Sequence, residues 1–153
     1  MEPAAASLKL PDVNMNLRTR TLGILFLLPL AGAGCSEARV RADTSAPAYA
    51  GEADIRYSRD KTGNGTIKLT IDHLAAPERI GSNYTAYVAW LEVEGREPAK
   101  LGVLEYDPKK RRGELTVSAA HKKLRLLVTL EESRDVVAPA GVRILAESVT
   151  AKR

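Results

Sequence analysis

The chain has 153 residues, of which 44 % are hydrophobic and 27 % are charged, proportions that are ordinary for one globular domain. Its formal net charge of +4 is small and lacks the clustering expected of a dedicated nucleic-acid binder. The single cysteine excludes an internal disulfide and any cysteine-rich metal site. Common catalytic and phosphate-binding motifs are absent from the sequence, so we expect neither an enzyme nor a bound cofactor.

Residues 1–34 have the pattern of an export signal. Arg18 and Arg20 provide positive charge, an uncharged and mostly apolar run covers residues 21–31, and three small residues precede Cys35. This order of charged, apolar and small-residue regions is typical of a secretory signal peptide. The apolar run is shorter than the about 20 residues that a transmembrane helix needs. An N-terminal anchor that is never cleaved, or a short buried helix, is the alternative.

The stretch Ala31-Gly-Ala-Gly-Cys35 resembles the lipobox of bacterial lipoproteins. The resemblance implies cleavage before Cys35, a diacylglycerol on its sulfur and acylation of its new amino group, and several acyl chains give stable anchoring. Ser36 follows in place of the aspartate that tends to retain such proteins at the inner membrane. We therefore favour the periplasmic face of the outer membrane, or the cell surface. Gly32 replaces the large aliphatic residue that the family prefers, which favours ordinary signal-peptidase cleavage nearby as an alternative.

The sequence divides into three parts. Residues 1–34 form the signal peptide region, and Met15 is the expected start because residues 1–14 would make an unusually long leader. Residues 35–50 are small, polar and proline-containing, without a helical or strand period, so we expect a lipidated, flexible tether there. Residues 51–153 remain for one modest hydrophobic core.

Short stretches with a period of two recur through residues 51–153. The clearest is Thr66–Leu74, where Ile67, Leu69 and Ile71 alternate with polar residues. Turn signals separate the stretches at a spacing typical of an all-β protein, so we expect an antiparallel, immunoglobulin-like sandwich of about seven strands. The expected strands are Ala53–Arg59, Thr66–Leu74, Tyr84–Glu94, Leu101–Tyr106, Glu114–Ala119, Leu124–Glu131 and Arg143–Thr150. Tyr84–Glu94 is apolar on both faces, which predicts a central strand, whereas the last stretch would also suit a short helix.

Part of this region resembles a known envelope domain. The segments Tyr87-Val-Ala-Trp90-Leu91, Leu101-Gly-Val-Leu104, Leu127-Val-Thr-Leu-Glu131 and Pro139-Ala-Gly are similar to the extracytoplasmic β-sandwich of anti-sigma-K-type factors. The resemblance covers roughly residues 84–150. It implies a shared sandwich architecture, without the helical domain that binds a sigma factor.

The sharpest surface feature is the basic run Lys109, Lys110, Arg111 and Arg112, in the turn before Glu114–Ala119. A solvated hairpin tip is the simplest interpretation, because charges also protect sheet edges from aggregation. The functional alternative is contact with anionic lipid headgroups or envelope polymers. Lys122 and Lys123 follow one strand later, and turns at opposite ends of a strand do not meet.

The two histidines, His73 and His121, lie on separate expected elements without a ligand spacing, so we expect surface histidines and no metal site. The sequence therefore predicts an exported, membrane-anchored cell-envelope lipoprotein, most consistent with a non-enzymatic binding or structural module. Its expected partners are the membrane, through lipid on Cys35, and an envelope protein or polymer, but not nucleic acid. The alternatives are a sensor or regulatory sandwich, and a small envelope hydrolase with a dispersed site.

Overall fold

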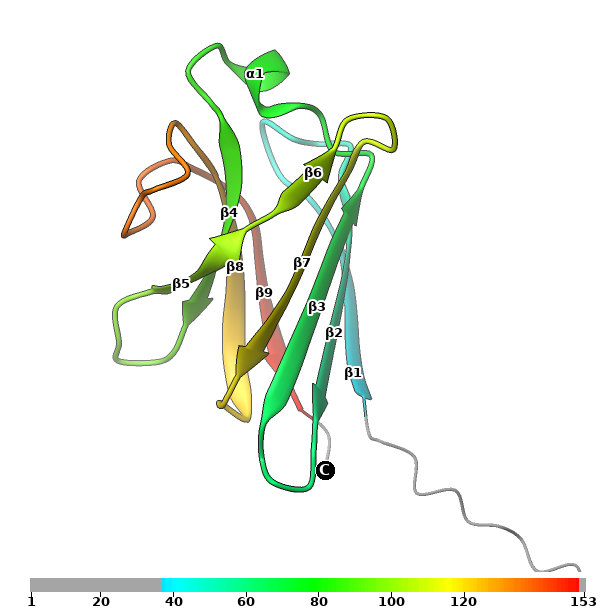
Figure 1. Cartoon of the computed structure of the whole chain (residues 1–153), viewed down its shortest axis with the longest axis vertical. Helices are drawn as coiled ribbons and strands as arrows, with labels where there is room; N and C mark the ends of the chain where they lie inside the picture. Colours follow the sequence, from blue (N-terminus) through cyan, green and yellow to red (C-terminus); the bar gives the residue numbers. More distant parts are fainter. Residues whose placement is uncertain (1–36, 152–153) are drawn as a thin grey trace, which may run out of the picture. The chain divides into compact units, whose positions relative to one another are not determined.

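Two antiparallel sheets pack face to face in residues 37–151, the part of the chain that this computed structural model describes (Figure 1). One sheet has five strands in the order β1-β2-β3-β7-β6, and the other has four in the order β5-β4-β8-β9. The elements are β1 Glu37–Asp43, β2 Glu52–Arg59, β3 Gly65–Asp72, α1 Pro77–Ile80, β4 Ala86–Glu92, β5 Ala99–Val103, β6 Glu105–Asp107, β7 Arg112–Ala119, β8 Lys123–Glu131 and β9 Val142–Thr150.

The strand order confirms the expected immunoglobulin-like sandwich. Without β1, the orders β2-β3-β7-β6 and β5-β4-β8-β9 match the ABED and C′CFG sheets of immunoglobulin domains. The prediction that Tyr84–Glu94 is a central strand is also confirmed, because β4 lies between β5 and β8. The last stretch forms the edge strand β9 and not a helix.

The sandwich has nine strands and not seven, and one reason is that the prediction of a flexible tether is wrong for residues 37–50. Residues 37–43 form β1, which pairs with β2 along its whole length, from Glu37 opposite Ser58 to Asp43 opposite Glu52. The strand alternates as a half-buried strand should, but two of its inward residues are alanines. Alanine contributes little hydrophobic signal, so the sequence pattern does not mark this stretch as a strand.

The loop that follows β1 is also packed into the domain. Thr44 and Ala48 are buried, and the Thr44 hydroxyl donates to the carbonyl of Ala48. The backbone N–H of Ser45 donates to the carbonyl of Ile144 at 2.7 Å, which joins this loop to β9 of the other sheet. The domain therefore begins at or before residue 37, and Cys35 and Ser36 lie outside the described residues.

The other additional strand comes from the expected strand Leu101–Tyr106, which changes sheets at Leu104. β5 pairs with β4, whereas β6 pairs with β7 in the opposite sheet. Leu104 is buried at the crossing, and its N–H donates to the carbonyl of Tyr87 at 2.8 Å. A Cβ on Gly113 would lie 2.9 Å from the end of the Leu104 side chain, so β7 packs closely against this crossing.

The inward faces of both sheets supply the main core. Ile67, Leu69 and Ile71 are buried as predicted, and β8 adds every second residue from Leu124 to Leu130. Trp90 is also buried, at 0 % exposure, but it lies in a second cluster with Ala86, Val88 and Leu127. These residues alternate with those of the main core, so the second cluster occupies the outer face of the four-stranded sheet.

Candidate functional site

The predicted basic run Lys109–Arg112 lies on the hairpin that connects β6 to β7 (Figure 1). One carboxylate oxygen of Asp107 accepts the backbone N–H groups of Lys109 and Lys110 at 2.9 and 3.1 Å, which fixes the turn. Arg111 has a positive φ of 53°, the left-handed conformation that reverses the chain at the end of this turn. The sequence-based prediction of a hairpin at this position is confirmed.

The side chains of this hairpin do not present four free cations. Arg112 donates from Nε to a carboxylate oxygen of Asp72 at 2.5 Å, and Lys110 lies 3.6 Å from Asp107. The Arg111 guanidinium donates to the carbonyl of His73 at 3.1 Å. The hydrogen bond from Arg112 to Asp72 also raises the pKa of Arg112. Arg112, the first residue of β7, is thus ion-paired. In the turn before it, the charge of Lys110 is partly neutralised by Asp107.

The partner of Arg112 belongs to a larger polar surface, the outward face of the five-stranded sheet. We call this surface the charged sheet face, formed by Arg39, Arg41, Asp43, Glu52, Asp54, Arg56, Lys68, Thr70, Asp72, Arg112 and Glu114. These residues alternate with the buried core residues of their strands, so their side chains share the outward side.

Strand register groups the charges of this face into bands. Asp43 lies opposite Glu52, and Glu52 lies opposite Asp72, so three carboxylates form a row across three strands. Arg39, Arg56 and Lys68 form a parallel row of cations in the same way. The two rows are about 13 Å apart, because four residues of strand separate them. Like charges directly opposite each other destabilise a sheet, so these pairings cost the sheet some stability.

Asp54 lies between the two rows and bridges cations from neighbouring strands. The Nε of Arg39 donates to both of its carboxylate oxygens, at 2.9 and 3.0 Å, and Arg56 lies 3.5 Å away. The Arg39 hydrogen bonds lower the pKa of Asp54, with a further contribution from Arg56, against the opposing effect of desolvation. Asp54 therefore stays ionised well below neutral pH and holds Arg39 and Arg56 of the cationic row in place.

Two hollows lie side by side on the charged sheet face. One has a volume of about 560 Å³ and is lined mainly by β1 and β2, and the other has a volume of about 300 Å³ and extends to Arg112. Asp54 and Asp72 line both hollows, which join the two into one polar surface. Hydroxyl, ammonium, guanidinium and carboxylate groups line the two hollows, so the surface offers donors and acceptors to a polar ligand.

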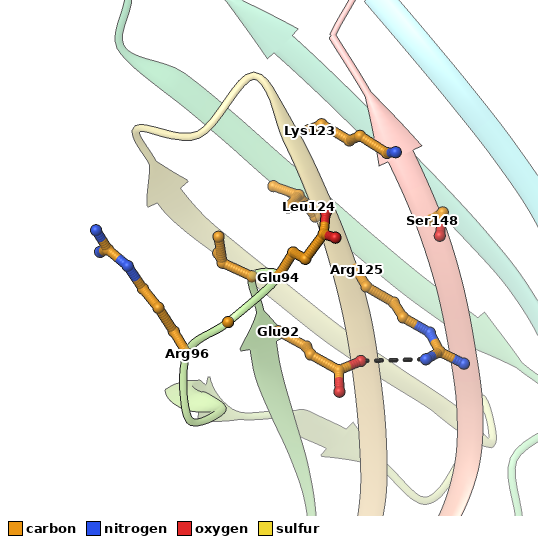
Figure 2. Close-up of a pocket in the computed structure, with 9 residues that line it drawn as sticks. Glu92, Glu94, Arg96, Lys123, Leu124, Arg125 and Ser148 are labelled. Atoms are coloured by element: carbon orange, nitrogen blue, oxygen red, sulfur yellow. Dashed lines mark hydrogen bonds and ion pairs between the residues drawn. The ribbon is translucent and has the colours of Figure 1, made fainter.

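A third hollow, of about 440 Å³, lies on the four-stranded sheet, where β4 ends and β8 begins (Figure 2). Arg125 donates to Glu92 at 3.2 Å across neighbouring strands. Figure 2 shows this ion pair beside Glu94, Lys123 and Ser148. The mixture of charges gives this hollow no marked preference for anions or cations.

The two histidines lie at opposite ends of the sandwich, since His73 follows β3 and His121 precedes β8. His73 lies near the start of β7, because the N–H of the next residue, Leu74, donates to the carbonyl of Arg111. His121 lies near the other end of β7, where Ala119 pairs with Gly65. They cannot share a site. Within residues 37–151, no group of three or more His, Cys, Asp or Glu side chains is arranged to hold a metal ion.

Sequence reasoning located the basic hairpin but missed Asp54, Asp72 and the cationic row. These residues occupy the outward positions of alternating strands, which are normally solvated and do not by themselves indicate a functional site. The predicted lipidation site, Cys35, lies outside the described residues. In the part of the chain that the structure covers, no helix has the length and apolar character needed to cross a bilayer.

Comparison with known proteins finds no matching family model, no matching curated protein and no matching solved structure.

Proposed function

We propose that this protein is a membrane-anchored lipoprotein of the bacterial cell envelope, held by lipid on Cys35, with a sandwich that acts as a non-enzymatic binding module. The signal pattern that ends at Cys35 supports export and anchoring. The charged sheet face supports binding, because a polar surface with two joined hollows on a sheet suits an extended partner such as an envelope polymer or a protein.

One observation carries the binding proposal, namely the register that places like charges opposite each other in two rows. Opposite charges in those positions would stabilise the sheet by roughly 0.2–1 kcal/mol for each pair. A surface that places three carboxylates in one row and three cations in another forgoes that stabilisation at those positions. It offers instead a banded charge pattern that a partner with complementary charges can match.

The anchoring half of the proposal is tested by Cys35→Ser in cells. The wild-type protein should fractionate with membranes and incorporate labelled fatty acid, and the variant should lose both properties. A variant that stays in the membrane at its full precursor mass would show that the apolar run is an uncleaved anchor.

The binding half is tested by cross-linking in cells, with a photo-reactive side chain at Thr70 on the charged sheet face. The matched control carries the same group at the exposed Ser148, on the other sheet. We expect an adduct from Thr70 that disappears when Arg56→Glu and Lys68→Glu reverse the cationic row. Equal adducts from both positions, or adducts that survive the charge reversal, would contradict the proposal.

A further inference from the structure

The described chain enters the sandwich at one end, which we call the anchor end. Glu37, the first residue of β1, pairs with Ser58 near the end of β2. The anchor end also contains the β2–β3 turn at residues 60–64 and the β7–β8 turn at residues 120–122, both at the bottom of Figure 1.

Hydrogen bonds hold the parts of the anchor end together. Arg59 donates to the carbonyl of Gly63 at 3.0 Å and to that of Ala120 at 3.4 Å, which braces one turn against the other. The Ala151 N–H donates to the Lys122 carbonyl at 2.9 Å, so the end of β9 meets the same turn. The anchor end is therefore one continuous surface.

Only Ser36 separates Cys35 from the first residue of β1. Two residues of extended chain span at most about 7 Å, whatever conformation they adopt. A 16-residue tether would have let the domain move freely above a membrane, but residues 37–50 belong to the sandwich. We infer, on the basis of the lipid anchor in the proposed function, that the anchor end rests directly on the phospholipid headgroups of the anchoring bilayer.

The free charges of the anchor end suit anionic headgroups. Lys61, Lys122 and Lys123 are exposed, and no ion pair engages them within residues 37–151. Asp60 uses its carboxylate inside its own turn, where it accepts from the backbone N–H groups of Thr62 and Asn64 at 2.9 Å each. The other charges at this end are Glu37, Arg59, Glu94, Arg96 and Glu97. The free lysines, and not a large net charge, set the preference for anionic lipid.

The basic hairpin Lys109–Arg112 lies at the opposite end of β7 from the lysines of the anchor end. The eight residues of β7 span about 26 Å at 3.3 Å per residue. Charges interact in physiological salt over a Debye length of about 8 Å. The hairpin therefore does not reach the headgroups of the anchoring bilayer, and it faces the rest of the envelope.

Fluorescence quenching in vesicles tests this orientation. Acylated full chain is reconstituted into vesicles of phosphatidylethanolamine and phosphatidylglycerol that contain a lipid with a nitroxide on its headgroup. Because Cys35 is acylated, a label reacts only with an introduced cysteine, at Lys61→Cys, Lys122→Cys or the matched distal position Lys109→Cys. We expect several-fold stronger quenching at positions 61 and 122 than at 109. Equal quenching at the three positions, or stronger quenching at 109, would overturn the inference.

Two further variants test the short connection and the lysines. A long Gly/Ser insertion between Ser36 and Glu37 should reduce quenching at position 61 to the level at 109. For the lysines, the label is placed on Thr62→Cys. The triple change Lys61→Gln, Lys122→Gln and Lys123→Gln should weaken its quenching. The triple change Lys109→Gln, Lys110→Gln and Arg111→Gln, at the far end, should not. Unchanged quenching after the insertion contradicts the role of the short connection.

Mass spectrometry of the reconstituted protein separates the two proposals. If Cys35 carries acyl chains and quenching does not depend on position, the orientation is wrong while the lipoprotein proposal stands. If Cys35 carries no acyl chain, both fail.

Discussion

The indole N–H of Trp90 donates to the hydroxyl of Thr129 at 2.7 Å, and that hydroxyl donates in turn to a carboxylate oxygen of Glu131 at 2.6 Å. The same carboxylate oxygen accepts the backbone N–H of Ala140 at 3.2 Å. Trp90, Thr129 and Glu131 are each no more than 2 % exposed. This buried chain ties the loop between β8 and β9 to the outer face of the four-stranded sheet.

Thr129→Val should destabilise the domain by about 2 kcal/mol, because it leaves the Trp90 N–H without its acceptor and removes a donor from the Glu131 carboxylate. The two side chains have nearly the same shape, so lost packing contributes little. Urea unfolding followed by Trp90 fluorescence measures the change. Thr116→Val, at an exposed position of β7, is the matched control and should change stability by less than about 0.5 kcal/mol. Equal effects of the two changes would mean that the Thr129 hydroxyl does not hold the loop.

Asp54→Asn should reduce stability near neutral pH by about 0.2–1 kcal/mol, the range for exposed ion pairs. The hydrogen bonds from Arg39 lower the pKa of Asp54 in the folded state. The stabilisation is therefore fully present above the unfolded pKa of about 3.9 and is lost as pH falls through the lower folded pKa. Thermal unfolding of both proteins from neutral to acidic pH should show the difference closing in that window.

The same substitution in an Arg39→Gln background provides the control for that experiment. Because Arg39 is the main cause of the lowered pKa, Asp54→Asn should cost less there, and its pH dependence should flatten. An unchanged cost in both backgrounds would assign the pKa of Asp54 to some other cause.

Ala38→Asp should destabilise the domain by at least about 2 kcal/mol, because it places a charge at a position that is 6 % exposed and packed against the core. Arg41→Asp, on the outward side of the same strand, is the matched control and should have a much smaller effect. If residues 37–43 were a flexible tether, neither change would alter the midpoint of denaturant unfolding.

The strand pattern was predictable wherever large aliphatic residues alternate with polar ones, as in β3, where Ile67, Leu69 and Ile71 mark the inward face. The sequence did not predict β1, whose inward residues include Ala38 and Ala42. Small side chains carry a weak hydrophobic signal, but pairing with β2 gives them a buried environment. The sequence also did not predict the break at Leu104, where one apolar stretch contributes strands to both sheets. A strand can change sheets without altering its period of two.

The candidate site was predictable only in part. The run of four basic residues indicated a charged hairpin, and the hairpin exists. The sequence could not reveal that Arg112 binds Asp72, 40 residues away, because that distance is closed by the pairing of β3 with β7. The rows of like charge were hidden for the same reason, since each row combines residues from three strands.

The cysteine after an apolar run is a local feature of the chain. The sequence by itself determined the export and lipidation hypothesis, the all-β class and most strand positions, because all three depend on residues close together in the chain. Only the tertiary structure decided that the sandwich begins by Glu37, and that the lysines near residues 61 and 122 share the end where the chain enters while the hairpin at 109–112 lies at the far end. Those relationships depend on strand register and on which ends of the strands coincide. Both are set by long-range pairing and by burial of the common core.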